Sequence, residues 1–168
     1  MSKSLQKVTP FLWFDRQAEE AARFYTSVFK NSRIETVTRY GEAGPGAKGS
    51  VMTVAFELDG RKFTALNGGP LFKFTEAVSF VVHCDDQQEV DEMWEKLLAG
   101  GKESQCGWLQ DKYGLSWQIV PTVLLEMLQD QDAERKERVV RAMLQMKKLD
   151  IAGLEAAYRP WPPESGVG

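Results

Sequence analysis

The chain has 168 residues, a formal net charge of −3, and ordinary globular proportions of 43% hydrophobic and 27% charged residues. That length can bury a sizeable core, and that composition excludes a chain that is disordered throughout. The charge provides no global attraction to nucleic acid or an anionic membrane, and no apolar run approaches the ~20 residues of a membrane span.

Strand-like and helix-like segments alternate in the first part of the chain. Patterns rich in β-formers predict four strands, over residues 8–14, 34–40, 51–58 and 61–66. Apolar residues at helical spacing predict a helix over 18–29, and four glycines and a proline make 41–49 a loop. Asp59-Gly60 between two strands is a strong hairpin signal. We therefore expect a β-α-β-β-β module over residues 1–67.

A second module is predicted over residues 68–121, after a linker at 67–74. It has a strand at 77–84, a helix at 87–99 that Gly100-Gly101 stops, one strand or two with a bend within 103–110, and a last strand at 115–121. Shifting the first helix by 69 positions places Ala21 on Val90, and shifting the first strand by 68 places Phe11 on Ser79. The match of residue character indicates an internal duplication.

Residues 122–168 are expected to form a C-terminal helical extension. Its segment 133–148 carries six basic residues against two acidic ones. Such a charge run is typical of a solvated helix face. Nucleic-acid binding is the weaker interpretation, because no aromatic residues interleave with the charges. We therefore expect no nucleic-acid partner and no membrane partner.

Three motifs are familiar: NGGP at 67–70, CGWLQDKYGLSWQIVP at 106–121 and MLQMKKLDIAGLEAAY at 143–158. With the two modules, they resemble the PhnB-like subfamily of the vicinal-oxygen-chelate (glyoxalase and bleomycin-resistance) superfamily, also labelled a 3-demethylubiquinone-9 3-methyltransferase domain. The resemblance covers nearly the whole chain. It implies an α+β fold of two modules, each rolling a sheet partway around a cavity, and often a homodimer.

The resemblance also implies where metal-using relatives carry their ligands. Those positions fall here on Thr9 (Pro10 if the register slips), Ala77 and Gln118, the last in place of the carboxylate of a D-x-x-G-x-x-x-E pattern. Threonine is a weak ligand, alanine has no donor atom, and neutral glutamine lacks the charge that anchors a dication. We therefore expect no metal and no other cofactor.

A methyl-donor site of the common Rossmann type needs a glycine-rich turn that opens a helix. The first strand instead runs into its helix through Asp15-Arg16-Gln17, and the glycine-rich stretches 41–49 and 67–69 do not open helices. The methyltransferase label is therefore not expected to describe the chemistry.

A cavity remains possible without a metal. Strand alternation gives an inward set and an opposite set that would pack under the helices. The inward set is Thr9, Phe11, Trp13, Ser79, Val81, His83, Ser116, Gln118 and Val120, with Trp108 at the entrance. The opposite set is Val8, Leu12, Phe14, Val78, Phe80, Val82, Trp117 and Ile119. An aromatic wall with hydroxyl and amide groups suits a small planar or apolar ligand, although the same residues could simply fill a core.

Three side chains have reactive potential. His83, the only histidine, could act as a general base beside Asp85 and Asp86, or be a surface residue next to two helix-capping carboxylates. Cys84 should be buried, and Cys106 has no second histidine to activate it as a nucleophile. The two thiols, and an N-terminus without a cleavable leader, predict a cytoplasmic protein.

Two further segments have structural and functional interpretations. The Asp-x-x-Gly pattern of residues 111–114 is typical of a turn that links two strands. Loop 41–49 is either a lid over a site or a mobile hairpin end.

The first functional hypothesis is a metal-free protein that binds a small aromatic or apolar molecule in a sheet-lined cavity. The alternative is a metal-independent isomerase or lyase acting on a carbonyl compound, with His83 and Gln118 as its polar groups. A third interpretation is a dimeric accessory protein without a site.

Overall fold

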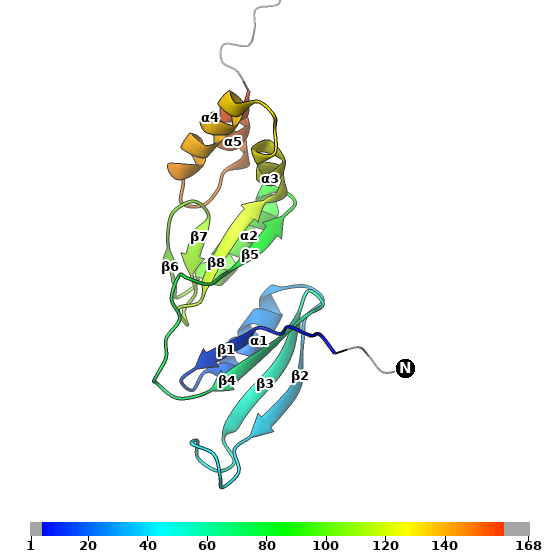
Figure 1. The fold of residues 1–168 in the computed structure, drawn as a ribbon, viewed down its shortest axis with the longest axis vertical. Coiled ribbons are helices and arrows are strands. Elements are labelled where there is room, and N and C mark those ends of the chain that lie inside the picture. Colours follow the sequence, from blue (N-terminus) through cyan, green and yellow to red (C-terminus); the bar gives the residue numbers. More distant parts are fainter. Residues whose placement is uncertain (1–4, 160–168) are drawn as a thin grey trace, which may run out of the picture. The chain divides into compact units, whose positions relative to one another are not determined.

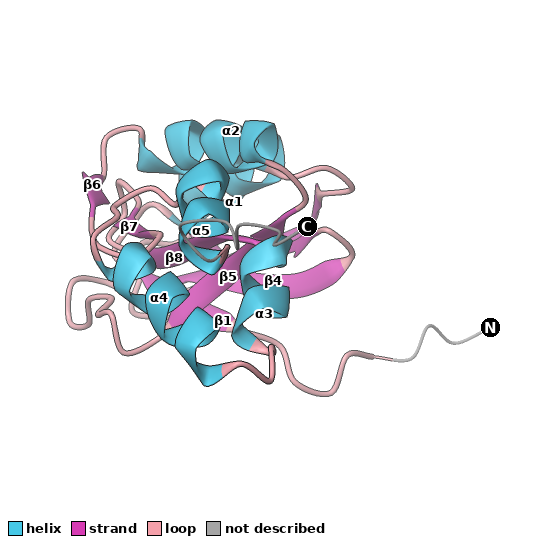
Figure 2. Cartoon of the chain, turned by 90° about the horizontal axis from the view of Figure 1, so that it is seen from above, coloured by secondary structure: helices cyan, strands magenta, loops and turns pink. Residues whose placement is uncertain are grey.

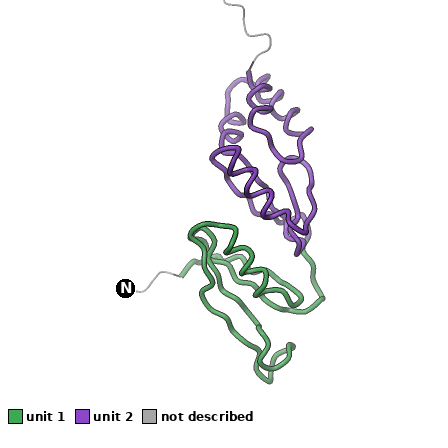
Figure 3. The backbone as a smooth tube through the Cα atoms, turned by 180° about the vertical axis from the view of Figure 1, so that it is seen from behind, with its two compact units in different colours: residues 1–74 green, residues 75–168 purple. Residues whose placement is uncertain are grey.

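The computed structural model describes residues 5–159. Two compact units divide the chain between residues 74 and 75, at the end of the predicted linker (Figure 3). Residues 75–159 of the second unit contain the second module and the described part of the C-terminal extension.

The first unit is one sheet with a helix on one face (Figure 1). Its elements are β1 (Phe11–Phe14), α1 (Ala18–Val28), β2 (Arg33–Arg39), β3 (Val51–Leu58) and β4 (Arg61–Asn67). The strand order is β1-β4-β3-β2, with β1 parallel to β4 and the other pairs antiparallel. The side chains of Ala21 and Tyr25 on α1, and of Val54 and Phe56 on β3, are fully buried because α1 packs on this face of the sheet.

The predicted hairpin between β3 and β4 is confirmed. Asp59 has φ 45° and Gly60 has φ 76°, the two positive values that a tight two-residue turn requires. Strand β2 is less regular, with register shifts between Ile34 and Thr36 and between Thr38 and Arg39.

The second unit repeats the first topology. Its elements are β5 (Ser79–Cys84), α2 (Gln87–Leu98), β6 (Lys102–Glu103), β7 (Trp108–Gln110) and β8 (Ser116–Pro121), in the sheet order β5-β8-β7-β6. Phe11 pairs with Thr64, and at the equivalent place Ser79 pairs with Ser116. The duplication and the alignment of Phe11 with Ser79 are therefore confirmed, and the segment 103–110 contains part of two strands.

The extension forms three helices, α3 (Thr122–Leu128), α4 (Ala133–Leu144) and α5 (Ile151–Tyr158), which lie beside one another (Figure 2). They surround a core cluster of Val120, Leu124, Met127, Val139, Leu149 and Leu154. Val120 belongs to β8, so the extension shares a core with the second module. None of the described helices is long and apolar enough to cross a membrane.

Strand alternation is confirmed for four residues of the set expected under the helices: Leu12, Phe14, Trp117 and Ile119 are all buried. It is wrong for Val8 and Val78, whose exposed fractions are 82% and 65%. Both precede the first residue of a strand, because β1 begins at Phe11 and β5 at Ser79. The hydrophobic runs therefore start before the regular pleat that would bury their side chains.

Candidate functional site

The first unit presents an open sheet face, on the side of the sheet opposite α1. Phe11 and Trp13 of β1 lie on it, paired with Thr64 and Leu66 of β4. Phe11 is 59% exposed and Trp13 is half-buried. Thr9, which precedes β1, is also half-buried. The face thus presents large apolar side chains that no helix of this unit covers.

The indole of Trp13 is held in place. Its Nε1–H donates to the carbonyl oxygen of Gly69 at 2.9 Å, and a Cβ at Gly68 would lie 2.4 Å from an indole carbon. The ring of Phe72, which is 58% exposed, meets the indole edge-on with 4.9 Å between centroids. We call Phe11, Trp13 and Phe72 the aromatic cluster. A fixed, amphipathic aromatic surface of this kind suits the stacking of a planar ligand.

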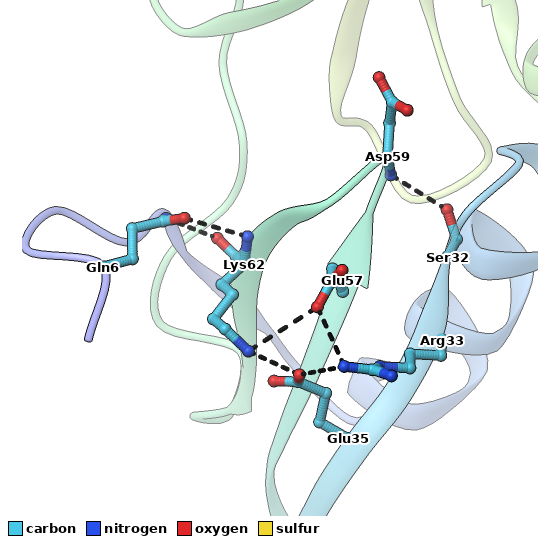
Figure 4. A network of polar contacts seen from close by, with 7 residues as sticks. All are labelled: Gln6, Ser32, Arg33, Glu35, Glu57, Asp59 and Lys62. Carbon is cyan, nitrogen blue, oxygen red and sulfur yellow. Dashed lines mark hydrogen bonds and ion pairs between the residues drawn. The ribbon is translucent and has the colours of Figure 1, made fainter. Parts of the chain in front are cut away.

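A charged cluster lies elsewhere on the same sheet, formed by Arg33, Glu35, Glu57 and Lys62 (Figure 4). The Lys62 Nζ lies 2.6 Å from Glu35 and 3.7 Å from Glu57, and Arg33 lies 3.5 Å from each carboxylate. The hydrogen bond from Lys62 lowers the pKa of Glu35 below its usual value. Two cations and two anions balance, so this cluster adds no net charge to the sheet.

The second unit has its own open face, opposite α2. Gln118 donates through Nε2 to the hydroxyl of Ser79 at 2.9 Å, and it pairs with Val81 on one side and Trp108 on the other. Val81 is 43% exposed and Trp108 is half-buried. Ser116 is fully buried, and its hydroxyl has no hydrogen-bond partner within residues 5–159. The predicted site residues are thus gathered in two groups, one in each unit.

The structure places His83 at the exposed end of β5, paired with Val120. The neighbouring carboxylate of Asp86 accepts from the backbone N–H of Glu89 at 2.8 Å and so caps α2. Cys84 is fully buried; burial, and secondarily Glu89, raises the pKa of its thiol to about 12. Cys106 is half-buried, and its backbone N–H donates to Met146.

The residues at the expected metal-ligand positions do not fit a divalent metal. Ala77 offers no donor atom, and the neutral amide of Gln118 already donates to Ser79. Across residues 5–159, no group of three or more His, Cys, Asp and Glu side chains is arranged to hold a metal ion.

A methyl donor of the Rossmann type does not fit either, because neither glycine-rich stretch connects a strand to a helix. Loop 41–49 joins two antiparallel strands, and Gly68-Gly69 follows β4. The first helical N–H of α1, at Ala18, already donates to the side-chain oxygen of Asn67 at 2.8 Å.

The glycine loop 41–49 is fastened to the sheet and does not hang free. The Tyr40 hydroxyl donates to the backbone oxygen of Asn67 at 2.5 Å. A Cβ at Gly44 or Gly46 would lie only 2.3–2.4 Å from ring carbons of Tyr40, so both glycines pack directly on the ring. Gly44 and Gly46 therefore anchor the loop on Tyr40, and whether it acts as a lid or as a mobile hairpin end stays a prediction.

Sequence reasoning missed the open cavity that this loop lines. The cavity has a volume of about 670 Å³ and lies entirely within the first unit. Its lining comes from residues 15–19 at the start of α1, from 40–51 around the glycine loop, and from the NGGP segment 67–70. The two glycine-rich stretches were the available signal, but they were interpreted separately as a loop and a linker.

The specific stretch DKYGLSWQ contains a structural carboxylate. Asp111 is buried, and its Oδ1 accepts from the backbone N–H groups of Tyr113 and Leu115 at 2.8 and 3.1 Å. Its Oδ2 accepts from the indole N–H of Trp117 at 2.9 Å. Asp111 therefore fixes the turn into β8, in agreement with the turn interpretation of this motif.

Five of the six basic residues of segment 133–148 have partners inside the chain. Arg135 lies near Asp130 and Asp132, and Arg138 donates to the last carbonyls of α5. The others are the pairs Arg141–Glu137, Lys147–Glu103 and Lys148–Asp91. These charges are used to hold the extension together and onto the second module, which agrees with a structural role.

Comparison with known proteins gives consistent matches. The family model described as 3-demethylubiquinone-9 3-methyltransferase matches residues 6–120. A PhnB protein from Bacillus cereus, described as a 3-demethylubiquinone-9 3-methyltransferase, is 40% identical with a TM-score of 0.64, covering 69% of this chain and 99% of that one. None of the curated proteins matches.

Two more distant structures show the fold alone. Protein PA1353 from Pseudomonas aeruginosa is 20% identical with a TM-score of 0.58, covering 70% of this chain and 98% of that one. The fosfomycin resistance protein FosX from Listeria monocytogenes is 17% identical with a TM-score of 0.53, covering 77% of this chain and 100% of that one.

Proposed function

We infer the function from the premise that this chain belongs to the family described as 3-demethylubiquinone-9 3-methyltransferase, whose PhnB-like members have a glyoxalase/bleomycin-resistance fold. The chain is a metal-free binding protein for a small aromatic or apolar molecule. Its ligand stacks on the aromatic cluster of the first sheet's open face. The methyl-transfer chemistry in the family's description is not part of this proposal.

The aromatic cluster carries the proposal. Isolated exposed apolar residues are ordinary, but here Phe11 and Trp13 share one sheet face and Phe72, from the linker, packs on Trp13, and such a gathering is a common sign of a binding surface. Trp13 is fixed by its bond to Gly69 and by its contact with Phe72, so little side-chain freedom is lost when a ligand stacks on it. The open face of the second unit carries polar groups of its own: Gln118 donates to Ser79 and pairs with Trp108.

Binding of 2-naphthol, followed by protein NMR and isothermal titration, tests the proposal. Trp13→Ala should weaken the affinity by more than about 1 kcal/mol, which is the loss expected for a stacking anchor. Phe11→Ser should weaken it as well, whereas the control Val8→Ser, which changes an exposed residue outside the cluster, should leave it unchanged. Saturable binding that neither variant weakens, or no binding to the wild-type protein, would refute the assignment.

The homodimer implied by the resemblance is part of the same proposal, and light scattering on the purified chain tests it. The alternative, a metal-independent isomerase or lyase, requires His83. Its discriminating variant is His83→Gln, which must abolish turnover of a carbonyl substrate while preserving the fold.

A further inference from the structure

The cavity of the first unit adjoins the aromatic cluster at Gly68 and Gly69, which contact Trp13, but its lining has a different chemistry. Its volume of about 670 Å³ is within the range of small-molecule sites. Its walls are preorganised, because the Asn67 side chain joins Ala18 at the start of α1 to Val51 at the start of β3, with bonds of 2.8 and 3.1 Å. The Tyr40 ring and hydroxyl fasten the glycine loop on the remaining side.

The neutral polar side chains of the lining already donate hydrogen bonds within the protein. The Tyr40 hydroxyl donates to Asn67, the Ser50 hydroxyl donates to Ala47, and the Asn67 amide donates to Val51. The hydroxyl protons of Tyr40 and Ser50 are thus committed, while their oxygen lone pairs can still accept. The neutral part of the lining therefore has a surplus of acceptors.

The charged part of the lining adds to this surplus. Asp15 and Glu19 contribute two carboxylates against the single guanidinium of Arg16. The Arg16 side chain is 91% exposed, and its Nε lies 3.9 Å from Asp15, beyond hydrogen-bond distance. Within residues 5–159 the Asp15 carboxylate accepts no closer bond, and Glu19 uses only one oxygen, toward Arg23 at 2.8 Å. Carboxylate oxygens therefore remain available to a ligand.

An anionic ligand is disfavoured at the same place. The first N–H of α1 is taken by Asn67, and the N–H of Ala21 is taken by the carbonyl of Gln17. Glu19 and Glu20 add negative charge to the first helical turn. We propose that this cavity is a second binding site, next to the aromatic cluster, that takes a small organic cation with N–H donors, an amine or a guanidine.

Three probes of nearly equal size and different charge test the proposal: benzylamine, benzyl alcohol and benzoate. Benzylamine should bind with a dissociation constant on the order of 1 mM, as suits a fragment of this size, and benzyl alcohol and benzoate should bind more weakly in that order. In ¹H–¹⁵N spectra the benzylamine shifts should centre on the amides of Gly46, Ala47 and Ser50, which line the cavity on the side of the glycine loop.

The charge variants separate this site from the other one. Asp15→Asn and Glu19→Gln should each weaken benzylamine binding about fivefold, while the matched control Glu20→Gln, on the same helical turn but outside the lining, should not. Neither lining variant should change 2-naphthol binding at Phe11. The cation site and the aromatic site are therefore tested separately, and either one can fail while the other stands. Three results would overturn the proposal. Benzylamine could fail to bind at concentrations up to 10-fold above the expected dissociation constant of ~1 mM, benzoate could bind more tightly than benzylamine, or the lining and control variants could weaken binding equally.

Discussion

Replacing Asp111 should destabilise the second unit, because one buried carboxylate satisfies three N–H groups there. Asp111→Ala removes these bonds and leaves the N–H groups of Tyr113, Leu115 and Trp117 without that acceptor. A buried donor that loses its partner costs about 1–3 kcal/mol. Three such losses, partly relieved by water at the turn, amount to about 3–5 kcal/mol. That is a large share of the 5–15 kcal/mol typical of a whole domain.

Asp111→Asn removes the charge of the carboxylate but keeps the shape of the side chain. It can keep the two backbone bonds through its oxygen, but its amide N–H₂ would then face the indole N–H of Trp117, so we expect a loss of about 2 kcal/mol. Trp117→Phe should cost less in the Asp111→Ala background than in the wild type, because its indole partner is already gone.

Urea unfolding followed by circular dichroism measures these differences. The matched control is Lys112→Ala, an exposed change in the same turn, which should cost less than about 1 kcal/mol. A loss below about 1 kcal/mol for Asp111→Ala, or a wild-type stability for Asp111→Asn, would refute the assigned role of this carboxylate.

The remaining predictions concern the glycine loop, the thiols and the extension. Gly46→Ala should destabilise the first unit by about 1–3 kcal/mol, because its Cβ would lie 2.3 Å from a ring carbon, whereas Gly41→Ala, with open space around it, should be near neutral in thermal melts. The Cys84 thiol should stay unmodified by a disulfide reagent at pH 8 until urea is added, since burial raises its pKa to about 12; labelling in the native state would contradict this. The hydrogen bond from Tyr158 lowers the pKa of Asp130. The stabilisation from this bond should therefore be fully present above the ordinary carboxyl pKa and be lost as the pH falls through the lowered pKa of Asp130. Urea midpoints between pH 2 and 7 should show a smaller acid loss in Tyr158→Phe, and identical pH profiles would contradict this.

Local patterns were sufficient to predict most of the elements. Strand β3 has the bounds that alternation predicts, and the Asp59-Gly60 turn has the expected positive φ values. Boundaries were less accurate where hydrophobic residues continue past the pleat, as at Val8 and Val78. The irregular register of β2 has no sequence signature, because a bulge depends on how two strands meet.

The candidate site was only partly predictable, because part of it also depends on how distant segments meet. Alternation correctly separated Leu12 and Phe14 from the open face, and the sequence alone disfavoured a metal at Ala77 and Gln118. The cavity depends on Asn67 reaching Ala18 and Val51, residues 49 and 16 positions away. Side-chain bonds to distant backbone groups leave no periodic pattern in a sequence, so the cavity had to be seen in the fold.

The contacts between the second module and the extension determine where this chain can be truncated. The family match ends at residue 120, in the middle of the core cluster that Val120 shares with Leu124 and Leu149. The backbone N–H groups of Cys106 and Gly107 donate to residues 146 and 147, and the Gln87 side chain bonds to residues 149 and 151. A variant of this chain cut at residue 120 would expose an apolar surface and leave these donors without their acceptors, so in this protein the second module and the extension should unfold as one cooperative piece.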